Sequence, residues 1–320
     1  IAAQVFEVVA GIVAIAIESP HSPPTFPLLS SLFLRHPHPM LAPCITTQTP
    51  TTEAVPPTPA AWCRRAGWPA AVARAWRRRG IRHWTPLQLA AWQAGVDRDT
   101  ADWLVAAPTS AGKSLVAEAA ALHHLLRGEQ VIWLAPTRAL ARSLADQLAP
   151  LLGRLGLRLA VATGEHPDPA FGVERGDFDL LVAVYEKALH WLVRWPEGLA
   201  RVGLLIADEL GMLRDPQRGP RLDILLTMAA RSPYAPRRLG LCAPGGEARA
   251  IAPWWGGRLL EHAGRPRPLH EGVFDAADAT FHWRARPGGE SGTEPLAGPD
   301  EWQGLVRATH EAACAAGLEP

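Results

Sequence analysis

The sequence of 320 residues contains only two lysines, Lys113 and Lys187, and no asparagine. Lysine and arginine together number 32, so almost every basic residue is an arginine. Without asparagine the chain cannot carry the guanine-reading Asn-Lys-x-Asp motif, which excludes the usual GTPases. The net charge of +1 offers no argument from overall charge for nucleic-acid binding, so any such contact must come from local patches.

Cysteines and long hydrophobic runs are also scarce. The four cysteines form no Cys-x-x-Cys pair and lie far apart, at Cys44, Cys63, Cys242 and Cys314. This usage indicates neither a zinc site nor a disulfide framework and is typical of a reducing cytoplasm. Residues 1–17 are apolar, but they contain Gln4 and Glu7 and are short for a membrane span. We therefore expect no membrane association.

The composition divides the chain into three parts. Residues 20–59 are rich in proline, serine and threonine and cannot build a packed core. We expect residues 1–59 to be a disordered tail, or in part sequence translated ahead of the true start, with a signal peptide as the weaker alternative. Residues 60–272 have a regular α/β pattern and predict one folded domain. Residues 273–320 predict a linker and the start of a second domain.

The pattern in the middle part predicts a doubly wound, mainly parallel α/β sheet. Short apolar segments predict strands at residues 102–106, 131–135, 159–163, 180–184, 204–207 and 239–242. Helical patterns lie before and between them, among others at residues 61–79, 86–95 and 116–126. Such an alternation is typical of a parallel sheet covered by helices. The loops at the carboxyl ends of its strands meet at one crevice, so they carry the candidate site residues.

The strongest motif is a phosphate-binding loop. Residues 107–114 read Ala-Pro-Thr-Ser-Ala-Gly-Lys-Ser and lie between a predicted strand and a predicted helix. Lys113 offers a compact ammonium to the β- and γ-phosphates, where the planar fork of arginine would not fit. The Ser114 hydroxyl is placed for Mg²⁺. The sequence therefore predicts a nucleotide site formed by Thr109, Ser110, Ala111, Gly112, Lys113 and Ser114.

An acidic pair follows the predicted strand at residues 204–207. Asp208 can hold Mg²⁺, and Glu209 can orient and deprotonate the attacking water. An Asp-Glu pair alone is most often a solvated loop, but its position at a strand end downstream of a phosphate-binding loop favours function. We expect Lys113, Asp208 and Glu209 to be catalytic, and Ser114 and Asp208 to be the metal ligands.

In order and spacing these motifs resemble the first RecA-like motor domain of a superfamily 2 DExH-type helicase of the Ski-like group. The resemblance is nearest to the archaeal DNA repair helicases related to helicase Q, and it covers residues 75–272. It rests on residues 84–88, the Q motif; 107–114, motif I; 136–140, motif Ia; 163–164; 182–187; 208–209, motif II; 218–220; 241–244, at the place of motif III; 254–256; and 265–269.

The resemblance implies a RecA-like P-loop ATPase that uses ATP and Mg²⁺. It further implies movement along single-stranded or partly duplex nucleic acid, with DNA favoured over RNA and 3′-to-5′ movement in the full-length protein. Gln88 would contact the adenine base. Arg138, Thr163 and Lys187 would contact phosphates of the strand rather than its bases. A charge pair at a helix start is the plainer interpretation of Lys187.

The sequence departs from the family pattern near the acidic pair. Gly211 stands where motif II usually ends in histidine, and Cys242-Ala243-Pro244 replaces the Ser-Ala-Thr of motif III. Val184 stands where the family often has threonine. The resemblance links motifs II and III to the coupling between hydrolysis and strand movement. These departures leave the hydrolytic residues in place and put that coupling in question.

The end of the chain bears on the expected activity. Residues 302–317 predict a helix that leads into a second RecA-like domain, which this sequence does not include. An arginine finger contributes about 10³–10⁵ in rate in nucleotide hydrolases. We therefore expect this chain alone to hydrolyse ATP very slowly. The alternative function is a non-hydrolysing module that binds nucleotide and single strands.

Overall fold

The computed structural model describes residues 58–164 and 176–264, and outside them the backbone of five strands. The chain divides into two units, residues 36–264 and residues 1–35 together with 265–320. Within the described residues, no helix combines the length and the apolar character that a bilayer span needs.

The larger unit is built on a seven-stranded sheet in which every pair of neighbouring strands is parallel. Its strand order is β5-β6-β4-β7-β8-β3-β9. The strands are β3 (Trp103–Ala106), β4 (Gln130–Ala135), β5 (Leu159–Ala162), β6 (Leu180–Val184), β7 (Val202–Ala207), β8 (Arg237–Cys242) and β9 (Arg258–Glu261). The predicted parallel α/β sheet is confirmed, and β9 is a strand that the sequence did not predict.

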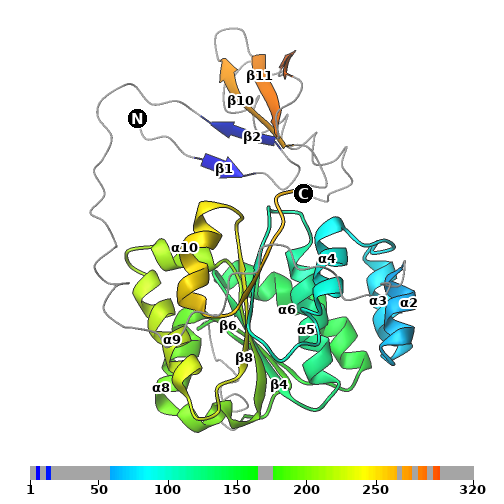
Figure 1. The fold of residues 1–320 in the computed structure, drawn as a ribbon, viewed down its shortest axis with the longest axis vertical. Helices are drawn as coiled ribbons and strands as arrows, with labels where there is room; N and C mark the ends of the chain where they lie inside the picture. Colours follow the sequence, from blue (N-terminus) through cyan, green and yellow to red (C-terminus); the bar gives the residue numbers. More distant parts are fainter. Residues whose placement is uncertain are drawn as a thin grey trace. The chain divides into compact units, whose positions relative to one another are not determined.

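Helices cover both faces of this sheet. Figure 1 shows α8, α9 and α10 on one side of the strands and α5 and α6 on the other. Parallel strands need such crossovers, because a chain must return to the same edge before each new strand. The bounds are α4 (Pro86–Ala94), α5 (Lys113–Leu125), α6 (Arg138–Arg154), α8 (Tyr185–Arg194), α9 (Gly219–Arg231) and α10 (Gly246–Trp255), with short 3-10 turns η1 (Pro196–Arg201) and η2 (Leu210–Arg214).

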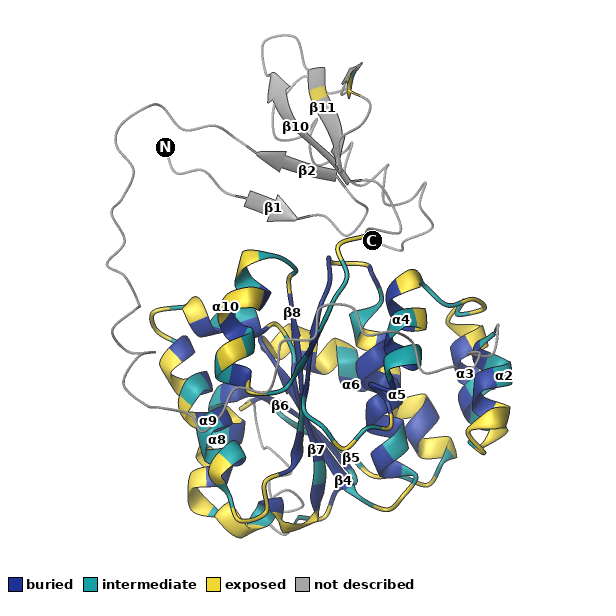
Figure 2. Cartoon of the chain, viewed as in Figure 1, coloured by how far each residue is buried: buried dark blue, intermediate teal, exposed yellow. Residues whose placement is uncertain are grey.

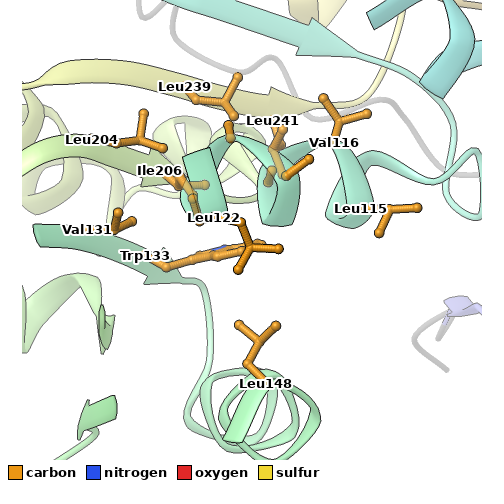
Figure 3. Packing of buried hydrophobic residues seen from close by; sticks show 14 of the residues in the cluster. Leu115, Val116, Leu122, Val131, Trp133, Leu148, Leu204, Ile206, Leu239 and Leu241 are labelled. Atoms are coloured by element: carbon orange, nitrogen blue, oxygen red, sulfur yellow. The ribbon is translucent and has the colours of Figure 1, made fainter. Parts of the chain in front are cut away.

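The central strands β3 and β6 are apolar along their whole length, and β4 is apolar after Gln130, because both faces of these strands are buried (Figure 2). Alternate residues point into two separate hydrophobic layers. Figure 3 shows one layer, in which Trp133 of β4 packs with Leu122 of α5 and Leu148 of α6. The opposite layer contains Ile132 and Leu134 of the same strand. These two layers fix the sheet and thereby the positions of the loops at its carboxyl edge.

The helix predicted over residues 61–79 is wrong as a single element. The structure has two helices there, α2 (Pro59–Arg65) and α3 (Ala70–Arg78). Gly67 adopts a left-handed φ of 69°, and Pro69 precedes the second helix. A proline disfavours helical backbone in the residue before it, so the chain turns at this point. Tryptophans of α2, the turn, α3, α4 and the segment before α4 pack together, in the pairs Trp62–Trp92, Trp62–Trp84, Trp68–Trp76, Trp76–Trp84 and Trp84–Trp92.

The smaller unit contains a five-stranded sheet of order β1-β2-β10-β11-β12. Its strands are β1 (Val5–Glu7), β2 (Ile12–Ile15), β10 (Leu269–Asp275), β11 (Thr280–Arg286) and β12 (Ser291–Pro295), and β2 pairs with β10 in parallel. Two of these strands come from the region expected to be a tail. The helix expected over residues 302–317 lies outside the described residues, and the tail and the second RecA-like domain stay predictions.

Candidate functional site

The phosphate-binding loop connects β3 to α5 as the sequence predicted. Gly112 precedes the helix with a left-handed φ of 97°, and Ser110 has a φ of 69°. The Lys113 ammonium donates to the carbonyl oxygens of Ala107 at 2.5 Å and Pro108 at 3.2 Å. The lysine is thus held at the start of the loop, at the amino end of α5. That helix end favours negative charge because its first N–H groups lack partners within the helix.

The start of α4 packs directly onto this loop. Thr85 caps the helix, and its hydroxyl donates to the carbonyl of Ala111 at 2.8 Å. The Gln88 amide accepts from the Thr85 N–H at 3.0 Å and donates to the Gly112 carbonyl at 3.3 Å. Gln88 is therefore buried against the loop that it was expected to accompany. Its contact with adenine stays a prediction.

Gly112 is required by this packing. A Cβ atom at that position would lie 2.2 Å from the Gln88 amide nitrogen and 3.2 Å from the Thr85 hydroxyl. The positive φ is also a conformation that side chains other than glycine adopt at a cost. The loop and the start of α4 therefore form one closely packed unit around Gly112.

The acidic pair leaves the sheet two strands away from the loop. Asp208 and Glu209 follow β7, and β8 separates β7 from β3. The Glu209 N–H donates to the Asp208 carboxylate at 2.9 Å, and Glu209 has a left-handed φ of 55°. Backbone held in this region by a residue other than glycine is strained, and such strain concentrates at functional sites.

Electrostatics link Asp208 to the loop. Burial, and after it the negative charge of Glu209, raise the pKa of Asp208 to about 6, while the Lys113 ammonium acts in the opposite direction. Because the charge of Lys113 affects the pKa of Asp208, the Asp208 carboxylate lies near the phosphate-binding loop. Perturbed carboxyl groups in such a place are candidates for chemistry. Lys113, Asp208 and Glu209 thus gather at one edge of the sheet.

The position of Gly211 is filled from another element. A Cβ on Gly211 would lie 2.4 Å from a carboxylate oxygen of Glu247, near the start of α10. The other carboxylate oxygen of Glu247 accepts from the Ala243 N–H at 3.2 Å. Glu247 therefore connects the turn after Glu209 with the loop after β8. Nothing in the spacing of the sequence pointed to this residue.

A cavity lies at the same edge of the sheet, beyond the ends of β4, β5 and β6. Its volume is about 420 Å³ and its walls are Pro136, Thr137, Arg138, Thr163, Val184, Glu186, Lys187 and Arg218. The three residues expected to contact a nucleic-acid strand, Arg138, Thr163 and Lys187, all line it. Lys187 reaches it across Gly164, where a Cβ would lie 2.5 Å from the lysine Cε. We call this cavity the strand pocket.

Arg218 is a wall of the strand pocket that was not among the predicted site residues. Its guanidinium donates to both carboxylate oxygens of Glu186, at 2.7 and 3.3 Å. Burial alone would raise the pKa of Glu186, but the hydrogen bonds from Arg218 hold it below its ordinary value. The guanidinium carbon also lies 5.8 Å from the centre of the Tyr185 ring. The signal for Arg218 was its place in the motif at residues 218–220.

Tyr185 connects the strand pocket with the acidic pair. It is the first residue of α8, directly before Glu186, and is fully buried. Its hydroxyl donates to the backbone carbonyl of Asp208. The Tyr185 side chain thus contacts Arg218 with its ring and the backbone of Asp208 with its hydroxyl.

Comparison with known proteins gives a family for this arrangement. Residues 85–243 match the model of the DEAD/DEAH box helicases. The chain is 33% identical over 205 residues to the ATP-dependent DNA helicase Hel308 of Pyrobaculum calidifontis. This alignment covers 64% of this chain and 28% of the relative. The Hel308 of Methanocella arvoryzae is 32% identical over 236 residues, 72% of this chain and 31% of that protein.

One solved structure is also similar. The crystal structure of the DUF1998 helicase MrfA aligns with a TM-score of 0.49 and 16% identity, covering 60% of this chain and 32% of that one. The matched region spans less than a third of the Hel308 relatives named above. The motifs of the matched region, its parallel sheet and the family model all indicate the same kind of domain. Residues 85–243 of this chain are a DEAD/DEAH box helicase domain of superfamily 2, with Hel308 helicases among its relatives.

Proposed function

We propose that this chain is the first RecA-like motor domain of an ATP-dependent DNA helicase. In the longer protein, hydrolysis of ATP would drive movement along single-stranded DNA, in the 3′-to-5′ direction. The observation that carries the proposal is the presence of two sites at one edge of the sheet. Lys113 with Asp208 and Glu209 forms one, and the strand pocket forms the other.

The residues at the loop suit a nucleoside triphosphate with Mg²⁺. The first N–H groups of α5, which begins after Gly112, suit phosphate oxygens, and Lys113 would bind the β- and γ-phosphates. Ser114, which is exposed, and Asp208 offer the hard oxygen ligands that Mg²⁺ prefers. Bound there, Mg²⁺ would neutralise charge on the phosphoryl group that is transferred. The remaining chemistry belongs to the protein's own residues.

Glu209 would act as the base. Its carboxylate is exposed, at the end of a strand that also brings Asp208. In this role it would orient the attacking water and accept its proton, since phosphoryl transfer depends mainly on positioning and charge. Asp208 would stay with the metal, and Lys113 would hold the phosphates. This division gives each of the three residues one task.

The strand pocket would bind the sugar-phosphate backbone. Arg138, Lys187 and Arg218 supply positive charge, and Thr163 supplies a hydroxyl. Contacts of this kind fix a strand without reading its sequence. DNA is proposed over RNA because the Hel308 relatives are named DNA helicases.

A second candidate is a module that binds nucleotide and strand without turnover. The observation that favours it is the changed link after the acidic pair, where Gly211 and Glu247 replace the expected histidine contact. Such a module would keep both ligand sites and lack phosphate release.

ATP hydrolysis by the chain tests the proposal, measured with and without a single-stranded oligonucleotide. We expect saturable ATP binding that Lys113→Ala abolishes, with slow turnover that DNA raises and Glu209→Gln removes. Binding of both ligands without phosphate release would favour the module. A chain that binds neither ATP nor DNA would contradict both candidates.

A further inference from the structure

We propose that Tyr185 is a positioning residue that couples occupancy of the strand pocket to the catalytic pair, through Arg218 on one side and the Asp208 carbonyl on the other. This inference rests on the proposed function, since it assigns the strand to one pocket and the nucleotide to the other site. It adds a route between them through Tyr185 and Glu186, neither of which is proposed to bind the strand or the nucleotide.

The first link is the ion pair in the strand pocket. Glu186 holds the Arg218 guanidinium through two hydrogen bonds, and this ion pair neutralises part of the pocket's positive charge. A phosphate of the strand offers a similar geometry to a guanidinium, because both ligands accept two parallel hydrogen bonds. A bound phosphate therefore competes with Glu186 for Arg218. The pocket has two states, which differ in the partner of this arginine.

The second link is the ring beneath that arginine. The guanidinium carbon of Arg218 lies 5.8 Å from the centre of the Tyr185 ring, a distance at which the cation attracts the ring face. Tyr185 is fully buried, so its ring can shift only slightly, within the packing of its neighbours. When Arg218 turns to a phosphate, the ring loses part of this contact and repacks within its buried site. Its hydroxyl moves with it.

The third link is a single peptide group. The Tyr185 hydroxyl donates to the carbonyl of Asp208, and the N–H of the same peptide group belongs to Glu209. That N–H donates to the Asp208 carboxylate at 2.9 Å. Because a peptide group is rigid, a pull on its carbonyl rotates the N–H as well. The rotation changes the φ of Glu209, which is already in the strained left-handed region at 55°.

The hydroxyl is a dependable donor in both states. A tyrosine hydroxyl has an ordinary pKa of about 10, well above neutral pH. The group therefore stays protonated and keeps its hydrogen bond to the carbonyl. Occupancy of the strand pocket thus biases the positions of Asp208 and Glu209, and by linkage a bound nucleotide biases the strand pocket equally.

The test is the coupling between the two ligands, measured as a ratio of affinities. A fluorescent, non-hydrolysable ATP analogue is titrated into the chain at fixed Mg²⁺ and salt, with and without a saturating single-stranded DNA oligonucleotide. We expect the strand to change the Kd of the analogue by about tenfold, a usual size for coupled sites. Tyr185→Phe removes only the hydroxyl, and we expect the ratio to fall to within about twofold of one, with each separate affinity kept within about threefold.

The only other tyrosine in the chain provides the control. Tyr234 is 46% exposed, and we expect Tyr234→Phe to keep the wild-type ratio. Should Tyr185→Phe fold poorly, Glu186→Gln tests the same route without touching the buried ring. It releases Arg218, so we expect both tighter strand binding and a Kd for the analogue close to the strand-bound value even without DNA.

The outcomes separate this inference from the proposed function. A Tyr185→Phe variant that keeps the full ratio, or a Glu186→Gln variant with the wild-type affinities, overturns the route through Tyr185. A wild-type chain that binds both ligands with a ratio of one also overturns it, and leaves the proposed function standing. A wild-type chain that binds neither ligand overturns both.

Discussion

The two edges of the parallel sheet are built differently. At the amino edge, where the strands begin, charged side chains are paired at short distances. Arg238 donates to Asp102 at 2.6 Å, and Arg258 donates to Asp99 at 2.7 Å. Buried Arg237 points into the same region and donates to backbone carbonyls. This edge holds β3, β8 and β9 together.

The carboxyl edge also contains an ion pair, Glu186 with Arg218, but it differs in holding strained backbone and a carboxyl group with a perturbed pKa. In the described part of the chain the only residues other than glycine with a positive φ are Ser110 and Glu209, and both lie there. Asp208 is at the same edge, with its pKa raised to about 6 chiefly by burial. Strain and unfavourable ionisation lower stability, and they are kept where they serve binding or chemistry. The comparison teaches that stability should depend on one edge and ligand affinity on the other.

The largest expected change in stability comes from removing an arginine at the amino edge. Arg237 donates to the Ala101 carbonyl at 3.0 Å, and its charge opposes the rise in the pKa of buried Asp97. Arg237→Ala leaves these groups without that partner, so we expect the free energy of unfolding to fall by about 3–5 kcal/mol. Denaturant unfolding measures it. Nucleotide affinity of the folded variant should be unchanged, and the exposed Arg249→Ala is the control, with an effect below about 0.5 kcal/mol.

A loss of less than about 0.5 kcal/mol in Arg237→Ala would remove the distinction between the edges, since an exposed arginine loses as much. A drop in nucleotide affinity without a change in stability would reverse it.

The second prediction breaks the carboxyl edge at the phosphate-binding loop. Gly112→Ala places a Cβ 2.2 Å from the Gln88 amide at a φ of 97°. We expect about 2–3 kcal/mol of strain, taken up by moving Gln88 and the loop, and a loss of nucleotide binding. Gly128→Ala is the matched control, because Gly128 has a φ of 79° and no atom within 4 Å. It should lose only about 1 kcal/mol of stability and keep its nucleotide affinity. Calorimetric titration with ATP compares the two, and equal losses would contradict the packing argument.

How well the sequence predicted each part follows from the range of the interactions. The loop at residues 107–114 was predicted because its contacts are encoded locally, in a glycine, a lysine and the helix that follows. The strands were predicted because burial on both faces makes them continuously apolar. The strand β9 was missed because only its two central residues are apolar, between Arg258 and Glu261, which is too short a run to indicate a buried strand.

The contacts missed at the site are long-range. Glu186 and Arg218 are 32 residues apart, and Tyr185 and Asp208 are 23 apart. No periodicity or spacing marks such a pair, because only the fold brings α8, α9 and the end of β7 together. The contact between Glu247 and Gly211, which lie 36 residues apart, is also long-range. Sequence could show that a histidine was absent there, but not which side chain had taken its place.

The third prediction sharpens the comparison through pH. The pKa of Asp208 is about 6 in the folded chain and near 4 when unfolded, so the folded state holds this proton more tightly. The contribution of the protonated Asp208 carboxyl to stability is complete below pH 4 and is lost as the pH rises through 6. Asn does not titrate, so we expect Asp208→Asn to be more stable than the wild type by about 1–2 kcal/mol at pH 8 and by little at pH 4. Thermal unfolding without Mg²⁺ at both values measures it.

The control for this titration has the opposite sign. Backbone hydrogen bonds from Arg218 and Gln217 lower the pKa of Asp215, so its ionised form stabilises the fold at neutral pH. Asp215→Asn should therefore be less stable than the wild type at pH 8, and this difference should vanish as the pH falls through the pKa of Asp215. A stability gain for Asp208→Asn that did not depend on pH would rule out ionisation as its cause.

The smallest effect concerns the contact between Gly211 and Glu247. Gly211→Ala displaces the Glu247 carboxylate, and we expect about 0.5–1 kcal/mol of lost stability because its hydrogen bond to the Ala243 N–H breaks. Glu247→Ala should cost a similar amount. The two changes remove the same interaction, so the double variant should lose no more than either single one, whereas independent sites would add. Additive losses would mean that Glu247 does not join the two loops. Gly246→Ala, with no atom within 4 Å, is the control for the added methyl group.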